Sequence, residues 1–309
     1  MSPDVHRGTE RFMKQKIIGT GLSGLVGSRI VELLKDKFEF INFSLDSGVN
    51  ILDTANLATA FEKNKDAVAI IHMAAFTDTN AAWEQKGDKS GICYQLNVQG
   101  TQNILNLAQK YNQQLIYIST DFVFDGTKST PYLETDIPNP IEWYGETKYL
   151  GEKVILDSGY SNYNISRITY PYRAKFDTKI DIVRKVLTKL QNGEPVKMFS
   201  DQICTYTFID DIATALAYFI KNKTTGIYHL VGSSSHSPYD MCLEIAKVFG
   251  LDQTLISTSS LEEFIKSQSE GSRPWQKTLI TSNQKATYLG LKFKTLTEGL
   301  EEIKRQLSL

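Results

Sequence analysis

The chain has 309 residues, with 34 lysines and arginines against 35 aspartates and glutamates and a net charge of −1. This balance provides no basic field for a nucleic-acid partner. The most apolar stretch, residues 67–76, is far too short to span a bilayer, so we expect no membrane partner.

The three cysteines, Cys93, Cys204 and Cys242, lie far apart and form no C-x-x-C pair. An odd, scattered set is typical of reduced thiols and predicts a cytoplasmic protein. The four histidines have no metal-ligand spacing, so no metal site is predicted. Residues 1–13 lack the apolar core of a signal peptide, and we expect a disordered extension there.

Strand-like apolar runs alternate with helical patterns through the first half of the chain. Strands are expected at residues 16–19, 38–43, 67–72, 114–119, 164–168 and, late in the chain, 226–231. Helices are expected between them at residues 28–35, 57–64, 94–111 and 144–157. Strands separated by helices predict right-handed crossovers, so the fold class is α/β, with a Rossmann-like doubly wound parallel sheet.

After residue 168 the alternation is less regular, and prolines punctuate helices expected at 180–191 and 239–248. We interpret this half as a smaller, mostly helical substrate-binding lobe that closes over the carboxyl edge of the sheet. The predicted domains are residues 14–168 with the returning strand 226–231 for dinucleotide binding, and residues 169–225 and 232–309 for the lobe.

A glycine-rich turn follows the first expected strand, with Gly21, Gly24 and Gly27 at three-residue spacing. A strand, a turn and a helix are the context of the dinucleotide fingerprint. Gly21 and Gly24 would let the backbone approach a pyrophosphate, and Gly27 would let the helix pack closely with its N-terminus toward the anion. The alternative is a tight strand–helix turn without a ligand.

Tyr144 and Lys148 are four residues apart on an expected helix, so the phenol and the ammonium share one face. A nearby positive charge lowers the pKa of a tyrosine from about 10, and such a tyrosine can exchange a proton with a carbonyl or an alcohol. A hydroxyl from Ser119 or Thr120, at the end of the fourth strand, would hold the same oxygen. The alternative is an exposed helical turn.

Three motifs occur in an order that resembles the extended short-chain dehydrogenases/reductases: TGLSGLVG from Thr20, STDFVFDG from Ser119 and YGETKYLGE from Tyr144. Within them the chain is most similar to the dTDP-4-dehydrorhamnose reductase family. The similarity continues through Asp201-Gln202, residues 207–213, residues 226–230 and Ser272-Arg273-Pro274, and so covers nearly the whole chain from Lys16 onward.

The resemblance implies a role for each matching residue. Thr120 would orient the substrate carbonyl, Tyr144 would donate the proton, and Lys148 would lower the tyrosine pKa and hold the nicotinamide ribose. The implied cofactor-binding residues are Gly21, Ser23, Gly24, Leu25, Val26, Asp53, Ala74, Ala75 and Lys148. The implied substrate-binding residues are Asp121, Phe122 and Arg273.

Some of these roles have a simpler alternative. Asp121 could equally be an acid enclosed by the fold with a purely structural role. Arg273 could be a surface arginine before a proline turn. Ala74 and Ala75 taken alone fit plain sheet–helix packing. The role of Asn97, on the expected helix 94–111, stays undecided.

Departures from the family pattern bear on the chemistry. Sugar-nucleotide dehydratases carry an acidic pair after the active-site threonine, whereas here Asp121 is followed by Phe122, which favours simple reduction. Tyr206 and Tyr170-Pro171 differ from the family near the expected substrate side and leave the sugar open. The second strand ends at Ser44 without the acid that would repel a 2′-phosphate, so the cofactor is NADPH or NADH, with NADPH favoured.

The resemblance thus implies reduction of a nucleotide-linked 4-keto sugar, dTDP-4-dehydrorhamnose to dTDP-rhamnose. The alternative function is an NADP-binding regulatory subunit like the beta subunit of methionine adenosyltransferase, and the presence of Thr120, Tyr144 and Lys148 together favours the enzyme. In the superfamily the helix pair 94–111 and 144–157 commonly forms a dimer interface, so a homodimer is one expectation. The residues that motivate it fit packing onto the sheet equally well: Ile104, Leu105, Leu150 and Ile155.

Overall fold

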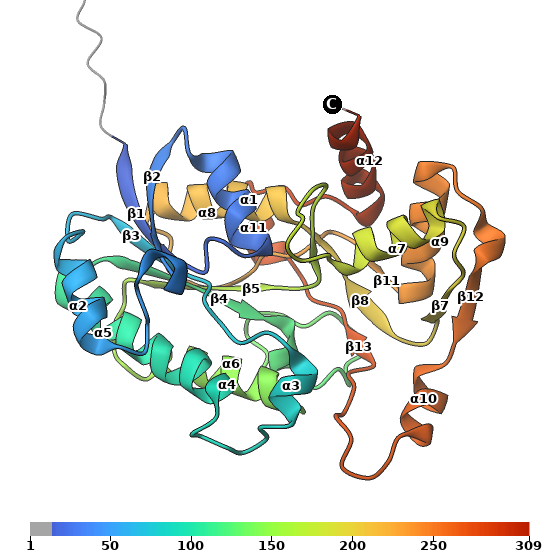
Figure 1. Ribbon diagram of the computed structural model, residues 1–309, viewed down its shortest axis with the longest axis horizontal. Coiled ribbons are helices and arrows are strands. Elements are labelled where there is room, and N and C mark those ends of the chain that lie inside the picture. Colours follow the sequence, from blue (N-terminus) through green and yellow to red (C-terminus); the bar gives the residue numbers. More distant parts are fainter. Residues whose placement is uncertain (1–13, 309) are drawn as a thin grey trace, which may run out of the picture.

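The computed structural model describes residues 14–308, so the expected extension at 1–13 lies outside the described residues. A parallel sheet of six strands forms its centre, in the order β10-β5-β4-β3-β1-β2 (Figure 1). The strands are β1 (Gln15–Thr20), β2 (Phe38–Phe43), β3 (Ala69–His72), β4 (Gln114–Thr120), β5 (Tyr163–Ile168) and β10 (Gly226–His229). From β1 the chain adds β2 on one side and then β3 on the other, so the strand order reverses between β1 and β3. The carboxyl ends of β1 and β3 are therefore the switch point of a doubly wound sheet. The expected fold class is confirmed.

Helices cover both faces of the sheet (Figure 1). One face carries α1 (Leu25–Leu34), α8 (Ile209–Asn222) and α11 (Gln284–Thr287), and the other carries α2 (Thr54–Glu62), α5 (Thr101–Tyr111) and α6 (Trp143–Leu156). Successive strand residues point to opposite faces, so Ile17 shares a core with Ile30 of α1, and Ile18 shares one with Leu57 of α2. Both faces are therefore apolar, and every residue of β3 and β4 is buried.

The helix expected at 94–111 is present as one continuous helix from Ile92 to Tyr111, with a π-helical segment inside it. It consists of α4 (Ile92–Tyr94), a π-helical segment at Gln95–Gly100, and α5. Next to the π-helical segment, a Cβ on Gly151 of α6 would lie 2.7 Å from the carbonyl oxygen of Asn97, so glycine allows the two helices to approach. Such π-helical turns are frequent at functional sites.

Ile104, Leu105 and Ile155 are fully buried in the core between these helices and the sheet. Three of the four residues that motivated a dimer interface therefore pack onto the sheet. The homodimer stays a prediction without their support.

The remaining chain forms a second group of elements beside the sheet (Figure 1). Its helices are α7 (Ile182–Gln191), α9 (Pro238–Phe249), α10 (Leu261–Ser267) and α12 (Leu296–Leu307). Its short strands are β6 (Pro171–Tyr172), β7 (Val196–Phe199), β8 (Ile203–Thr205), β9 (Thr207–Phe208), β11 (Ser235–His236), β12 (Ile256–Ser259) and β13 (Thr278–Leu279). They pair as three small sheets, and helices α7, α9 and α12 enclose a separate apolar core.

The position of α8 differs from the domain boundaries expected from the sequence. Leu216 and Phe219 of α8 share the core of Ile17 and Ile30, so α8 belongs with the sheet and not with the lobe. The reason is topological, because a parallel strand such as β10 needs a crossover element that covers the sheet. No helix within residues 14–308 has the length and apolar character needed to cross a membrane.

Candidate active site

The glycine-rich turn after β1 lies against the end of β3. Gly21 has a positive φ of 71°, and a Cβ on it would lie 2.8 Å from the backbone nitrogen of Ala74. The hydroxyl of Thr20 accepts hydrogen bonds from the backbone nitrogens of Met73 and Ala74 at 3.2 and 3.1 Å. Glycine is therefore required at position 21, both by the backbone conformation and by the close approach of two chain segments at the switch point.

Gly24 and Gly27 shape the start of α1. Gly24 is the N-cap and has no side chain to bind the amides of the first turn, which suits an anionic ligand. A Cβ on Gly27 would lie 2.6 Å from the carbonyl oxygen of Gly21, so only glycine lets the helix pack on the turn. The other expected cofactor residues of this region lie on the same turn and the first helical residues: Ser23, Leu25 and Val26.

Asp53, the expected adenine contact, is the N-cap of α2. Its Oδ1 accepts hydrogen bonds from the backbone nitrogens of Ala55 and Asn56 at 3.1 and 3.0 Å, and the residue is exposed. The cap explains this acid without a ligand. Ala74 and Ala75 are half-buried just after β3. Contacts of these residues with a cofactor stay predictions.

Thr120 and Tyr144 meet at the carboxyl end of β4. Thr120 is the last residue of β4, and its hydroxyl lies beside the Tyr144 phenol, whose pKa it acts to lower. Ser119 is turned away, because its hydroxyl donates to Oε1 of Glu152 at 2.6 Å. Of the two hydroxyls that the sequence left open, Thr120 is the one beside the phenol.

A buried ion pair lies behind this site. Arg167 of β5 donates from Nε and Nη2 to the carboxylate of Glu152 on α6 at 2.9 and 2.6 Å. The two side chains are 2% and 0% exposed. With Ser119 as a third partner, the pair ties α6 to β4 and β5.

Lys148 follows Tyr144 by one helical turn and is buried. Its Nζ donates a hydrogen bond to the carbonyl oxygen of Ile118 at 2.8 Å and lies 4.0 Å from the centre of the Tyr117 ring. Burial lowers the pKa of Lys148 to about 7, and the carboxylate of Glu152 partly opposes this shift. The lysine therefore titrates near neutral pH.

The pKa of Tyr144 differs from the sequence-based expectation. Burial raises the pKa above its ordinary value, the carboxylates of Glu142 and Asp121 raise it further, and Thr120 opposes the rise. The expected lowering is wrong for this structure, because the cost of burying a phenolate outweighs the favourable contacts. A phenol that stays protonated is the form that can donate a proton to a carbonyl oxygen.

Asp121 is enclosed next to Thr120. The hydroxyls of Thr120 and Thr169 donate to its two carboxylate oxygens at 3.1 and 2.6 Å, and the residue is almost fully buried. Burial raises the pKa of Asp121 to about 6. These bonds favour the structural interpretation, and a substrate contact stays a prediction.

Aromatic rings surround the phenol on another side. The Phe122 ring centre lies 5.9 Å from that of Tyr144 and 6.4 Å from that of Tyr170, and Tyr170 lies 5.5 Å from Tyr206. Tyr170 has a φ of 35°, which bulky residues rarely adopt outside functional sites. The two tyrosines that depart from the family pattern are thus neighbours.

Arg273 reaches the site from the loop before β13. Its Nε donates to Oδ1 of Asn80 on α3 (Thr79–Trp83) at 3.1 Å, and its guanidinium lies 4.1 Å from the centre of the Trp275 ring. Burial lowers the pKa of Arg273, and the carboxylate of Glu142 opposes this. Among residues 14–308 no carboxylate lies within 4.0 Å of its nitrogens, so its charge is available to an anionic ligand.

Sequence reasoning left Asn97 undecided and missed Glu142. In the π-helical segment, Asn97 accepts a hydrogen bond from the backbone nitrogen of Phe76 at 2.8 Å and donates one to the hydroxyl of Thr147 at 2.9 Å. Glu142 is a buried N-cap of α6. A residue before a helix can be recognised as a cap from the sequence, but its burial cannot.

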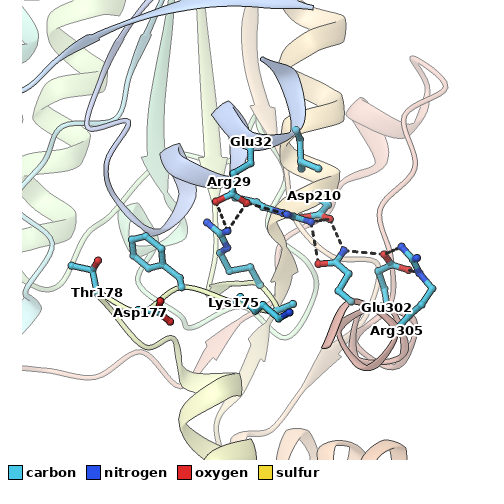
Figure 2. Close-up of a pocket in the computed structure, with 13 residues that line it drawn as sticks. Arg29, Glu32, Lys175, Asp177, Thr178, Asp210, Glu302 and Arg305 are labelled. Carbon is cyan, nitrogen blue, oxygen red and sulfur yellow. Dashed lines mark hydrogen bonds and ion pairs between the residues drawn. The ribbon is translucent and has the colours of Figure 1, made fainter. Parts of the chain in front are cut away.

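A cavity of about 730 Å³ lies away from this chemistry, where α1, α8 and α12 meet (Figure 2). Arg29 of α1 donates to Asp210 of α8 at 2.7 Å and to Gln306 of α12 at 3.0 Å. Arg173 donates to Glu32 of α1 at 2.6 Å. These bonds pair half of the charged lining residues and link the helix after the glycine turn to α8 and α12.

A doubly wound sheet with a glycine turn at its switch point and a Thr–Tyr–Lys group at the end of β4 defines a dinucleotide-binding oxidoreductase. The family described as the RmlD substrate binding domain matches residues 15–308, and the chain belongs to this family. The family resemblance stated from the sequence is confirmed, as is the class of NAD(P)-dependent oxidoreductase.

The chain is similar to proteins with two kinds of name. The dTDP-4-dehydrorhamnose reductase of Aggregatibacter actinomycetemcomitans is 30% identical over 237 residues, which is 74% of this chain and 78% of that protein. Methionine adenosyltransferase 2 subunit beta of Bos taurus is 28% identical over 250 residues, which is 77% of this chain and 73% of that protein. The crystal structure of dTDP-4-dehydrorhamnose reductase from Bacillus anthracis in complex with NADP has a TM-score of 0.85 and 25% identity, and covers 95% of this chain and 100% of that one.

Proposed function

We propose that the protein reduces the carbonyl group of a nucleotide-linked 4-keto sugar with NAD(P)H, and that the substrate is dTDP-4-dehydrorhamnose and the product dTDP-rhamnose. The observation that carries this proposal is that Thr120 lies beside Tyr144 at the carboxyl end of β4, while Lys148, one helical turn further along α6, binds the Ile118 carbonyl oxygen of the same strand. Two relatives at 30% and 25% identity are named as reductases of this sugar.

The glycine turn fits a dinucleotide. The space that a Cβ would fill at Gly21 and Gly27 is occupied by backbone, and the first turn of α1 carries no side-chain cap. These features let a pyrophosphate approach the helix N-terminus. The bound cofactor supplies the hydride that adds to C4 of the sugar.

The chain's own residues handle the proton and the orientation of the substrate. When substrate binds, the Thr120 hydroxyl turns from the Asp121 carboxylate and donates its hydrogen bond to the carbonyl oxygen, which orients it. The Tyr144 phenol gives its proton to this oxygen as the carbon accepts the hydride, and is then reprotonated from solvent. Lys148 offers its ammonium to the nicotinamide ribose, and its charge stabilises the transient phenolate. Arg273 contributes a guanidinium to the nucleotide diphosphate.

NADPH is favoured over NADH. β2 ends at Phe43, and Ser44 then caps a short turn in a reciprocal pair with Ser47. No acidic residue stands at the end of the strand to repel a 2′-phosphate. The relative from Bacillus anthracis was solved with NADP. Titration with each cofactor, followed by nicotinamide fluorescence, measures this preference, and tighter binding of NADH would contradict it.

A regulatory subunit is the second candidate, because a methionine adenosyltransferase subunit is also 28% identical. The two functions differ in whether the isolated chain turns over. We expect the purified chain, without a partner, to oxidise NADPH when given dTDP-4-dehydrorhamnose, and Tyr144→Phe to abolish most of this activity. Absence of turnover on dTDP- and UDP-linked keto sugars, together with binding to a methionine adenosyltransferase catalytic subunit, would favour the regulatory function.

A further inference from the structure

Glu142 is a buried carboxylate at the site that the proposed reaction does not use. It is 1% exposed and forms the N-cap of α6. Its Oε2 accepts a hydrogen bond from the backbone nitrogen of Tyr144 at 3.0 Å, and its Oε1 accepts one from Gly145 at 2.5 Å. Both oxygens therefore hold the first turn of the helix that carries the proposed proton donor.

The backbone of Phe122 also packs closely against this turn. A Cβ on Gly145 would overlap the carbonyl oxygen of Phe122 and would lie 2.8 Å from Oε1 of Glu142. The first turn of α6 is thus fitted between the Glu142 carboxylate and the residues that follow Thr120. A change in the hydrogen bonds to Glu142 would move the Tyr144 phenol relative to the Thr120 hydroxyl.

Charged and titratable groups face Glu142 from each neighbouring element. Arg273 of the loop before β13 favours the ionised carboxylate, and Asp121, after β4, opposes it. The carboxylate in turn raises the pKa of Cys93 on α4 and of Tyr144 on α6. Burial is the largest of all these effects and raises the pKa of Glu142 to about 7, against the two backbone hydrogen bonds, which lower it.

We propose that Glu142 is a positioning residue whose ionised carboxylate holds the Tyr144 phenol beside Thr120, and whose protonation releases it. In a protonated carboxyl group one oxygen carries the proton and acts as a hydrogen-bond donor. This oxygen no longer accepts a strong hydrogen bond from a backbone N–H, as both oxygens of a carboxylate do. Turnover should therefore decline as the pH falls through neutrality. The kinetic part of this inference rests on the proposed function, but the positioning of Tyr144 does not.

The first test follows the ring NMR signal of Tyr144, assigned by its loss in Tyr144→Phe, from about pH 5.5 to about pH 8.5. The wild-type signal should shift with a midpoint near pH 7. The part of the shift centred near pH 7 should disappear in Glu142→Gln and in Glu142→Asn, which caps helices well without a charge, and only a shift near pH 6 from Asp121 should remain. Glu142→Asp should keep a shift, and Glu146→Gln, at an exposed carboxylate on the same turn, should leave it unchanged.

The second test measures the ratio of wild-type kcat to Glu142→Gln kcat at each pH, so that titration of Lys148 in the same range cancels. For a single group with this midpoint, the ratio should rise about tenfold between about pH 6 and about pH 8. A flat ratio, or a Tyr144 signal that titrates in Glu142→Gln as in the wild type, would overturn the proposal. If the signal behaves as expected but the wild type reduces no nucleotide sugar, the proposed function is wrong and the positioning role stands.

Discussion

The ammonium of Lys148 donates a 2.8 Å hydrogen bond to the backbone carbonyl oxygen of Ile118, one strand residue before Ser119. Lys148 is thereby anchored to β4, the strand whose end carries Thr120. Helix α6 carries the Tyr144 phenol and the Lys148 ammonium. Strand β4 carries the Thr120 hydroxyl and the Ile118 carbonyl oxygen that binds Lys148. The proposed chemistry thus depends on the registration of α6 against β4.

Replacement of the proton donor separates catalysis from binding. Tyr144→Phe should reduce turnover by about 10²–10⁴, the usual range for loss of a general acid, while cofactor affinity stays nearly unchanged. Thr120→Val should also reduce turnover with little effect on cofactor binding. Steady-state rates and a cofactor titration check both variants. Wild-type turnover in Tyr144→Phe on a verified substrate would refute the assignment of Tyr144.

Lys148→Met should lose activity and cofactor affinity but gain stability. The unfolded state keeps this lysine protonated up to about pH 10.5, whereas the folded state releases the proton near pH 7. The folded state therefore bears the full cost of the buried charge below pH 7, and this cost fades as the pH rises toward 10.5. Removing the charge should stabilise the fold by roughly 4 kcal/mol at low pH, because each pKa unit between 10.5 and about 7 is worth about 1.4 kcal/mol and the hydrogen bond to Ile118 is lost.

Urea unfolding of Lys148→Met at several pH values measures this gain, which should shrink in alkaline solution. Lys153→Met provides the control, because Lys153 lies on the same helix with a 46% exposed side chain. Equal stability of Lys148→Met and wild type at pH 6 would show that the buried ammonium is not costly.

The close approach at the glycine turn can be separated from the backbone conformation. Gly21 and Gly159 have nearly equal φ angles of 71° and 72°, but a Cβ on Gly21 would meet Ala74, and one on Gly159 would meet no atom within 4 Å. Both alanine variants should lose about 1 kcal/mol from backbone strain, and Gly21→Ala should lose more because its Cβ would overlap the backbone of Ala74. Only Gly21→Ala should also weaken cofactor binding. We expect a loss of affinity of about tenfold or more, which corresponds to about 1.4 kcal/mol or more of binding free energy.

Cofactor titrations of the two variants, together with thermal unfolding, test this contrast. If a folded Gly21→Ala protein bound the cofactor as tightly as the wild type, the glycine turn would not be part of the cofactor-binding site.

The buried ion pair of Glu152 and Arg167 should be sensitive to loss of one partner. Glu152→Gln leaves a guanidinium that is 2% exposed without its counter-charge, and such a loss typically costs about 3–5 kcal/mol. Glu262→Gln, which breaks the exposed pair with Lys266, should change stability very little. Denaturant midpoints measure both, and equal midpoints for the two variants would contradict the prediction.

Much of the fold was predictable because the signals are local. Each strand of the central sheet shows as a short apolar run, and β2 begins and ends at the expected residues. The glycine spacing after β1 predicts the turn, since no other residue type fits its backbone. By contrast, no helix was expected at α8 or α12. The residues of α8 were assigned to the substrate-binding lobe and not to the sheet, because their packing partners on the sheet are distant in sequence.

The sequence by itself determined the family, the parallel sheet and the Tyr144–Lys148 pair, because order and spacing along the chain carry that information. Only the tertiary structure shows what turns Ser119 away from the phenol: its hydroxyl donates to Glu152 of α6, and Glu152 is held in turn by Arg167 of β5. It also decided that the pKa of Tyr144 is raised. The pKa of a buried group depends on its burial and on charges that many different elements bring close to it. A local sequence pattern therefore does not predict its value.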